Sequence, residues 1–240
     1  MKLQEIYDEL DKISPFELQE KWDNSGILIG DRDSKIDKII LSLDIDEELL
    51  LKSDNDVLFI VHHPLIFSGI TQFDFSKYPA NLIKIMIKKN QSLIAMHTNF
   101  DKTHLNRYVF EDILDFTMDN FQDFIYVTNR VIGKKELISH IKDRLDIDRL
   151  KIVNPKDEIR GVALTTGSGA SLMDKIDVDC MLTGDIKYHD AMKAKAQNLM
   201  MIDIGHFESE KFFAEVLKME LDNLPILAII SNSKNPFYHS

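Results

Sequence analysis

The feature that most constrains the fold is a set of short apolar runs that are continuous rather than alternating. Residues 39–44 and 57–61 are the clearest examples. A strand with one face in water alternates apolar and polar side chains, so continuous runs indicate burial on both faces. Helical patterns separate many of these runs, which predicts an α/β fold with helices flanking the sheets. Several strands follow one another without a full crossover helix, which favours mixed rather than purely parallel sheets.

The periodicity assigns most of the chain to helices or strands. Helices are predicted at residues 3–13, 46–52, 80–89, 106–116, 134–145, 187–196 and 206–221. Strands are predicted at residues 39–44, 57–61, 92–96, 124–131, 150–153, 159–165, 179–182, 199–204 and 225–230. A short apolar run also lies between Gly26 and Gly30.

The charge and the cysteine content exclude several classes of protein. The chain has 29 basic and 40 acidic residues, a net charge of −11, which disfavours an extended nucleic-acid groove but permits a mononucleotide held at a metal. One cysteine, Cys180, excludes an intramolecular disulfide and indicates a reducing compartment. The acidic, amphipathic start differs from a signal peptide, and no apolar run approaches the roughly 18 residues of a membrane span. We therefore expect a cytoplasmic protein without a membrane partner.

Histidines collect at the predicted carboxyl ends of strands, where α/β sheets bind ligands. Four of the eight histidines lie within two residues of such an end: His62, His63, His97 and His206. Neighbouring side chains on a strand point to opposite faces, so His62 and His63 would suit two different metal ions at a twisted strand end closed by Pro64. The alternative interpretation of His-His-Pro is an ordinary turn.

A second group of potential ligands begins at Gly205-His206. The spacing of four places His206 and Glu210 on one face of a helix. The helix dipole disfavours imidazolium in the first turn, and neutral imidazole is the form that binds metal. The alternative is an exposed amphipathic turn, and we expect Glu208 to be solvated.

Three further motifs are ambiguous on their own. His97-Thr98-Asn99-Phe100-Asp101 is predicted to be a strand end and loop, in which Asp101 is either a ligand or a cap. Gly167-Ser168-Gly169 predicts either an anion-binding nest or a tight turn. Trp22-Asp23-Asn24 predicts a polar rim with an aromatic stacking face, although the single tryptophan could equally belong to the core.

Taken together, histidine, aspartate and glutamate at several strand ends suit two divalent ions with a shared carboxylate. Sites that mix imidazole and carboxylate are typical of Zn, Fe or Mn. Glu210 is the predicted bridging group, because its stem is longer than that of Asp101 and it lies one helical turn from His206. The alternative is that Glu210 binds one ion only or caps the start of the helix.

The ordered set of motifs resembles the NIF-three-like family, whose members are often named GTP cyclohydrolase 1 type 2 homologues. The resemblance extends from about Leu3 to Phe237. It rests on these motifs in order: Trp22-Asp23-Asn24-Ser25-Gly26 with Gly30, His62-His63-Pro64, His97-Thr98-Asn99-Phe100-Asp101, Gly167-Ser168-Gly169, Thr183-Gly184-Asp185, His189, and Gly205-His206 with Ser209-Glu210. One departure is Asp185, where many relatives have Glu.

The resemblance implies one family unit over residues 1–240 with two similar α/β lobes and a dinuclear metal site between them. Lobe one would comprise about 1–123 plus 222–240, and lobe two about 124–221. The implied ligands of the two ions are His62, His63, Asp101, His206 and Glu210. The resemblance also implies a ring-shaped homohexamer, a trimer of dimers.

These observations predict a metal-dependent hydrolase acting on a small-molecule substrate that is nucleotide-like or otherwise anionic. His97 and His189 are predicted either to orient the metal ligands or to transfer protons. The alternative is a non-catalytic protein, either a metal-dependent adaptor or a metal-handling protein. A plain Rossmann nucleotide binder is disfavoured because the sequence lacks the GxGxxG motif.

Overall fold

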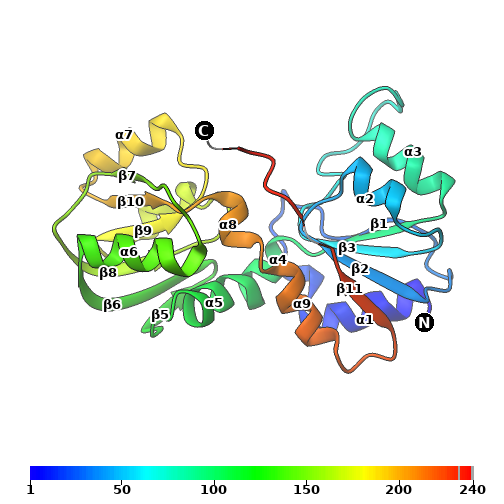
Figure 1. Ribbon diagram of the computed structural model, residues 1–240, viewed down its shortest axis with the longest axis horizontal. Coiled ribbons are helices and arrows are strands. Elements are labelled where there is room, and N and C mark those ends of the chain that lie inside the picture. Colours follow the sequence, from blue (N-terminus) through cyan, green and yellow to red (C-terminus); the bar gives the residue numbers. More distant parts are fainter. Residues whose placement is uncertain (232, 239–240) are drawn as a thin grey trace. The chain divides into compact units, whose positions relative to one another are not determined.

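The structure, a computed structural model, describes residues 1–231 and 233–238 and has the predicted α/β architecture with two mixed sheets flanked by helices (Figure 1). It divides into two compact units. Unit 1 is Met1–Phe100 with Phe213–Ser240, and unit 2 is Asp101–Phe212. The lobe limits expected near residues 123 and 222 stay a prediction, because compactness alone does not define separately folding domains.

Unit 1 contains a five-stranded sheet in the order β1-β4-β3-β2-β11. β1 pairs antiparallel with β4, and the other neighbours are parallel, which makes the sheet mixed as predicted. The strands are β1 (Gly26–Ile29), β2 (Lys38–Ser42), β3 (Leu58–Val61), β4 (Ser92–Ala95) and β11 (Leu227–Ile230).

Helices cover both faces of this sheet, which explains the continuous apolar runs. Figure 1 draws α2 and α3 on one side and α1 and α9 on the other. Phe59 and Leu93 belong to a buried cluster with Leu50 of α2 and Met86 of α3. All four residues of β3 are buried, as a strand covered on both faces requires. The helices are α1 (Leu3–Ile13), α2 (Glu47–Lys52), α3 (Ala80–Lys88) and α9 (Phe213–Leu221), with a 3-10 turn at Phe16–Leu18.

Unit 2 contains a six-stranded mixed sheet in the order β5-β6-β8-β9-β10-β7. β8, β9 and β10 are parallel neighbours, and the remaining pairings are antiparallel. The strands are β5 (Asn120–Gln122), β6 (Ile125–Gly133), β7 (Lys151–Val153), β8 (Glu158–Leu164), β9 (Cys180–Thr183) and β10 (Met200–Asp203).

The helices of unit 2 pack on this sheet, and buried apolar side chains lie between helix α7 and the strands. Helix α6 packs on β6, and α7 packs on β7 and β10. Met181 and Met201 form a buried cluster with Ala194 of α7 and Met173. The helices are α6 (Lys134–Leu145), α7 (Tyr188–Ala196) and α8 (His206–Glu210), with a 3-10 helix at Ala170–Lys175.

The helix predicted at residues 106–116 begins earlier than expected. It runs through α4 (Thr98–Phe100), a π-helical turn (Asp101–Leu105), α5 (Asn106–Tyr108) and a second π-helical turn (Val109–Ile113). The expectation of a loop at Asp101 is therefore wrong. The backbone amide of Thr98 donates to Asp23 Oδ2 at 3.0 Å, so a carboxylate distant in sequence takes the role of a helix cap.

The single helix predicted at residues 206–221 is also wrong, because the structure contains two helices, α8 and α9. The break coincides with the passage of the chain from unit 2 to unit 1. The Phe212 ring lies 6.2 Å from Tyr108 within unit 2, whereas the Phe213 ring lies 5.2 Å from Phe100 within unit 1. Neighbouring aromatic residues thus contact different units.

Within the described ranges, 1–231 and 233–238, no helix has both the length and the apolar character needed to cross a membrane.

Candidate metal centre

Three histidines come together in unit 1, after the ends of β3 and β4. His62 and His63 directly follow β3, and His97 lies two residues beyond β4. One ring nitrogen from each histidine lies within 4.8 Å of one ring nitrogen from each of the other two. The ring centroids of His62 are 5.0 Å from those of both His63 and His97. The parallel pairing of β3 with β4 causes this convergence, because it brings both carboxyl ends to the same edge of the sheet.

Each of these imidazoles is oriented through its Nδ1 atom. Nδ1 lies 2.9 Å from the Met96 carbonyl oxygen in His62, 2.8 Å from Asp44 Oδ1 in His63 and 2.8 Å from Asp23 Oδ1 in His97. An acceptor at Nδ1 favours the tautomer that is protonated there, so Nε2 becomes the atom that can bind a metal. Carboxylates and carbonyls in this position are typical of metal-binding histidines.

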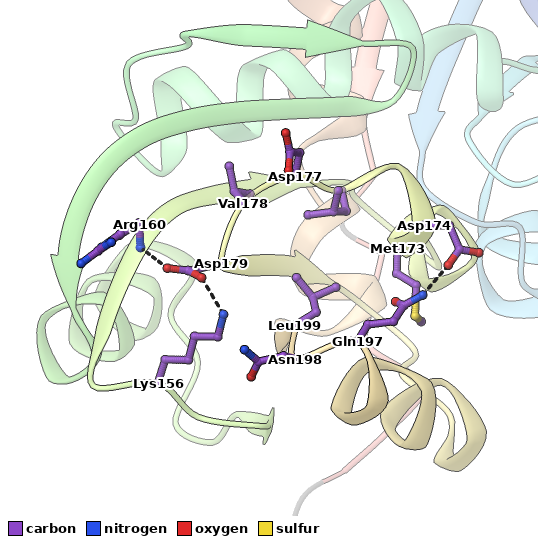
Figure 2. Close-up of a pocket in the computed structure, with 11 residues that line it drawn as sticks. Lys156, Arg160, Met173, Asp174, Asp177, Val178, Asp179, Gln197, Asn198 and Leu199 are labelled. Carbon is purple, nitrogen blue, oxygen red and sulfur yellow. Dashed lines mark hydrogen bonds and ion pairs between the residues drawn. The ribbon is translucent and has the colours of Figure 1, made fainter.

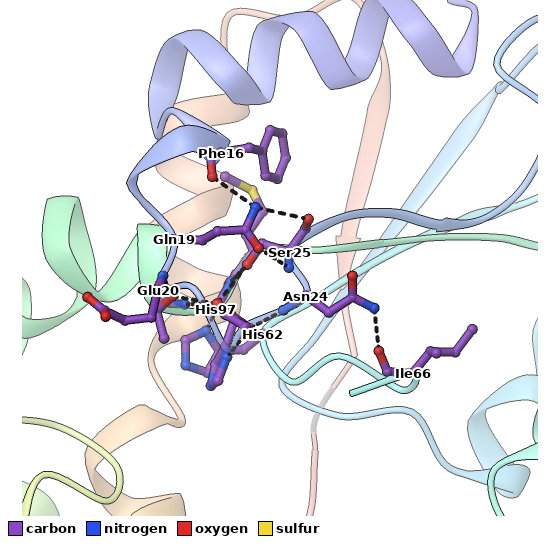
Figure 3. A network of polar contacts seen from close by, with 11 residues as sticks. Phe16, Gln19, Glu20, Asn24, Ser25, His62, Ile66 and His97 are labelled. Atoms are coloured by element: carbon purple, nitrogen blue, oxygen red, sulfur yellow. Dashed lines mark hydrogen bonds and ion pairs between the residues drawn. The ribbon is translucent and has the colours of Figure 1, made fainter. Parts of the chain in front are cut away.

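Asp23 is the centre of a polar network around His97. Figure 3 shows His97 and Ser25 of this network. Besides the His97 ring, Asp23 accepts hydrogen bonds from the Thr98 amide and hydroxyl and from the Ser25 hydroxyl. Burial of the Asp23 carboxyl opposes its ionisation. The hydrogen bond and charge of His97, together with the Thr98 hydrogen bonds, outweigh this effect and hold the Asp23 pKa well below its usual value. Asp23 is therefore an ionised group that fixes the position of His97.

Unit 2 contains a second set of ligands at the carboxyl ends of β9 and β10. His206 Nε2 lies 3.0 Å from Glu210 Oε2, as the spacing of four predicted. His206 Nδ1 lies 2.7 Å from Asp185 Oδ2. Asp185 has a left-handed backbone with φ of 54°, which aspartate tolerates better than most residues. Asp185, which is shorter than the Glu that many relatives have at this position, therefore still provides a carboxylate that orients His206.

Glycines let the surrounding loops approach His206 and Glu210 closely. A Cβ atom on Gly167, whose φ is 59°, would lie 2.1 Å from Glu210 Oε1. A Cβ atom on Gly184 would lie 2.6 Å from the His206 amide nitrogen. The amide of Gly167 donates to Ser209 Oγ and that of Gly169 to Thr183 Oγ1. These amides are engaged within the protein, so the tight-turn interpretation of this loop describes it better than an anion nest.

Asp101 lies in the first π-helical turn and is only 8% exposed. The carboxylates of Asp101 and Glu210, both in unit 2, each offer an oxygen within 4.8 Å of the other. Glu210 is itself 3% exposed. Two buried carboxylates at this separation repel each other, and a bound cation would offset that repulsion. Single π-helical turns are frequent at functional sites.

His189 has a different environment. It is exposed in the first turn of α7, where its ring contacts that of Tyr188 at 5.4 Å. Its predicted role in proton transfer stays a prediction.

A hollow of about 490 Å³ lies at the opposite end of the unit 2 strands (Figure 2). Its lining residues precede β9 and β10, whereas Asp185 and His206 follow these strands. Two of its acidic groups are paired with lysines: Lys156 Nζ lies 2.6 Å from Asp179, and Asp174 accepts from Lys193. The metal-ligand types collect at the other end, so this hollow is separate from the candidate centre.

Sequence reasoning missed three carboxylates that orient histidines: Asp185, which contacts His206, and the pair Asp23 and Asp44. Asp44 was assigned to the end of a strand and Asp23 to a polar rim, yet they contact His63 and His97. Asp44 follows β2, the parallel neighbour of β3, so its strand-end position was a usable signal. Asp23 follows no strand, and its role depends on a loop contact that the sequence pattern does not reveal.

The match to a family model is decisive for classification. The model of Duf34/NIF3 (NGG1p interacting factor 3) matches residues 1–236. The chain belongs to the Duf34/NIF3 family. The resemblance inferred from the motifs is thereby confirmed.

Two curated proteins are similar to this Duf34/NIF3 chain over almost its full length. A protein of Campylobacter jejuni named "GTP cyclohydrolase 1 type 2 homolog" is 47% identical over 240 residues, which is 100% of both chains. A Helicobacter pylori protein named "GTP cyclohydrolase 1 type 2" is 39% identical, covering 98% of this chain and 97% of that protein.

Solved structures support the Duf34/NIF3 fold. The crystal structure of a Staphylococcus aureus hypothetical protein has a TM-score of 0.87 and 26% identity, covering 100% of this chain and 99% of that one. A Bacillus cereus protein described as related to NIF3 has a TM-score of 0.82 with 17% identity, covering 100% and 99%. The second likeness concerns the fold alone.

Proposed function

We propose that this protein is a dinuclear metal-dependent hydrolase that acts on a nucleotide-like or other small anionic substrate. The observation that carries the proposal is the shared design of the two ligand sets. Histidines converge at strand ends, and each imidazole is oriented through Nδ1 by a carboxylate or a carbonyl. The names of the Campylobacter jejuni and Helicobacter pylori relatives support a nucleotide as the substrate class.

The donor types fit divalent ions such as Zn, Fe or Mn. In this proposal His62 and His63 of unit 1 act with Asp101, His206 and Glu210 of unit 2 to hold two ions. Imidazole nitrogens and carboxylate oxygens are both present, a mixture that these metals accept. Glu210 would hold both ions, since a carboxylate offers two oxygens in one plane and a neutral imidazole offers a single nitrogen. Its burial beside Asp101 supports this assignment.

When bound, the ions would supply Lewis-acid activation of water and of the substrate. The residues of the chain have separate roles. Asp23 keeps the His97 ring oriented, and His97 transfers a proton between the reacting groups and solvent. His189, exposed on α7, is proposed as a second proton-transfer group. Asp44 and Asp185 position His63 and His206.

The test begins with metal content. Protein loaded with Mn or Zn should approach two ions per chain by elemental analysis. His62→Ala and His63→Ala should each reduce this content strongly, and thermal unfolding would show that each variant is folded. The loaded protein is then assayed on a panel of nucleotides and small anionic esters. Full metal content in the double variant would contradict the metal site.

The same experiment separates catalysis from a binding role. Turnover that chelation abolishes and metal restores would support the hydrolase. Metal binding without turnover on any substrate would contradict it and favour a metal-dependent adaptor or metal-handling protein. The single buried thiol, Cys180, fits a reducing compartment, so we propose a cytoplasmic location.

A further inference from the structure

Two exposed aromatic rings lie beside His97 in unit 1. The Trp22 and Phe67 side chains are 57% and 49% exposed. Their ring centroids are 5.9 Å apart, with 36° between the planes. The His97 ring lies 6.1 Å from Trp22 and 6.2 Å from Phe67, with its plane steeply inclined to both. The three rings therefore form one cluster in which two large apolar side chains are exposed to solvent.

The tripeptide Trp22-Asp23-Asn24 organises this cluster. Trp22 supplies an aromatic face, and the next residue, Asp23, holds the His97 ring at 2.8 Å. Asn24 Nδ2 donates to the Ile66 carbonyl oxygen at 2.5 Å, which ties the segment carrying Phe67 to the segment carrying Trp22. Figure 3 shows the Asn24 side chain directed toward Ile66. A contact held by fixed hydrogen bonds is pre-organised, which lowers the entropic cost of binding.

We propose that Trp22 and Phe67 bind the planar heteroaromatic ring of the substrate and so determine its specificity. This inference rests on the proposed function and extends it by naming the chemical group that is recognised. Aromatic side chains stack on every nucleobase because each base has a π-face. A ring bound at Trp22 would lie next to His97, which the proposed function already assigns to proton transfer.

The charge of the protein decides between a small ligand and a nucleic-acid strand. A net charge of −11 repels a long phosphodiester backbone, whereas a single heteroaromatic ring needs no basic groove. Exposed apolar groups also occur at protein interfaces. The position of these rings against His97, which belongs to the candidate centre, favours the small ligand, and a protein contact is one outcome of the test.

Trp22 is the only tryptophan in the sequence, so its fluorescence reports on this site directly. Guanosine, GTP and inorganic tripolyphosphate are titrated into the metal-loaded protein. We expect saturable quenching with guanosine and GTP, and none with tripolyphosphate. Calorimetry should show GTP binding about tenfold weaker in Trp22→Leu, with tripolyphosphate binding unchanged and with most of the GTP affinity restored in Trp22→Phe. Phe67→Leu should weaken GTP binding in the same direction.

Phe73→Leu is the matched control. Phe73 is 58% exposed and lies in the same connection between β3 and α3, but its ring contacts that of Phe75. This variant should keep the GTP affinity of the parent protein. The proposal is overturned if guanosine and GTP fail to quench, or if Trp22→Leu binds GTP as the parent does. It is equally overturned if Trp22→Leu changes only the oligomeric mass, because the rings would then serve a protein contact.

Failure of this site and failure of the proposed function give different results. If no substrate is hydrolysed but guanosine still quenches Trp22, the hydrolase is excluded and the ring-binding site is supported. If metal-dependent hydrolysis of a nucleotide occurs with a KM that Trp22→Leu leaves unchanged, the hydrolase is supported and the ring-binding site is excluded.

Discussion

His206 Nε2 and Glu210 Oε2 lie 3.0 Å apart, one helical turn from each other, at the first and last residues of α8. Glu210 is buried and His206 is partly exposed, so the pair points from the core of unit 2 toward its surface. This arrangement places an imidazole nitrogen and a carboxylate oxygen, two common metal ligands, close together before any ion binds. The same pair provides the most direct test of the bridging assignment.

Glu210→Gln should lower the affinity for both ions together, by more than about tenfold. The substitution keeps the shape of the side chain but removes the negative charge that offsets two divalent ions. Competition with a chelator measures the affinities. Glu208→Gln, on the same helix, is the control and should change little. The bridging role is wrong if Glu210→Gln keeps two ions at the parent affinity, or if Glu208→Gln is the variant that loses them.

Gly167→Ala should weaken metal binding while leaving the protein folded. The new Cβ atom would lie 2.1 Å from Glu210 Oε1, so the carboxylate must move, and the φ of 59° adds backbone strain. We expect about a tenfold loss of metal affinity. Gly133→Ala is the control, since nothing lies within 4 Å of a Cβ atom at that position. Equal metal affinities in the two variants would show that the Gly167 contact does not hold Glu210 in place.

Asp179 should stabilise unit 2 in a pH-dependent manner. Its pKa is lowered from the ordinary 3.8, first by the hydrogen bond from Lys156, against the effect of burial. A lowered pKa in the folded state means that the stabilisation is present above about pH 4 and is lost as the pH falls through the folded-state value. Asp179→Asn should therefore cost about 1 kcal/mol at neutral pH.

The measurement is urea unfolding of parent and variant at several pH values. The difference between parent and Asp179→Asn should shrink as the pH falls through the lowered pKa of Asp179. Asp177→Asn, at an exposed position just before Asp179, should show no such difference. A gap that stays constant with pH would mean that the effect of Asp179→Asn does not come from its charge.

The oligomeric state implied by the family resemblance is a homohexamer. β11 forms an edge of the unit 1 sheet, and its Leu227 and Ile229 side chains are 59% and 40% exposed. Exposed apolar edge strands are normally covered by another chain or element. Light scattering should give about six times the chain mass of 27.8 kDa. A monomer at micromolar concentration would contradict the hexamer and leave the metal site unaffected.

The local patterns of the sequence were enough to determine the fold class and most of the elements. Continuous apolar runs such as the one at β3 are buried on both sides, and their burial forces helices onto both faces of the sheet. The His206 and Glu210 spacing was predictable for the same reason: a helix has a fixed period, so the partner at the fourth position is set by geometry within a few residues. The mixed sheets also followed from connections too short for crossover helices.

Only the tertiary structure decided how the ligands are oriented and where two helices begin and break. Asp23 caps the helix at Thr98, which is 75 positions later in the sequence, and it orients His97, which is 74 positions later. The local periodicity of the sequence cannot predict contacts between such distant residues. The break between α8 and α9 falls where Phe212 contacts Tyr108 of unit 2 and Phe213 contacts Phe100 of unit 1. Short-range spacing is a property of the backbone, whereas these contacts depend on which distant segments pack together, and packing is decided by the burial of the whole chain.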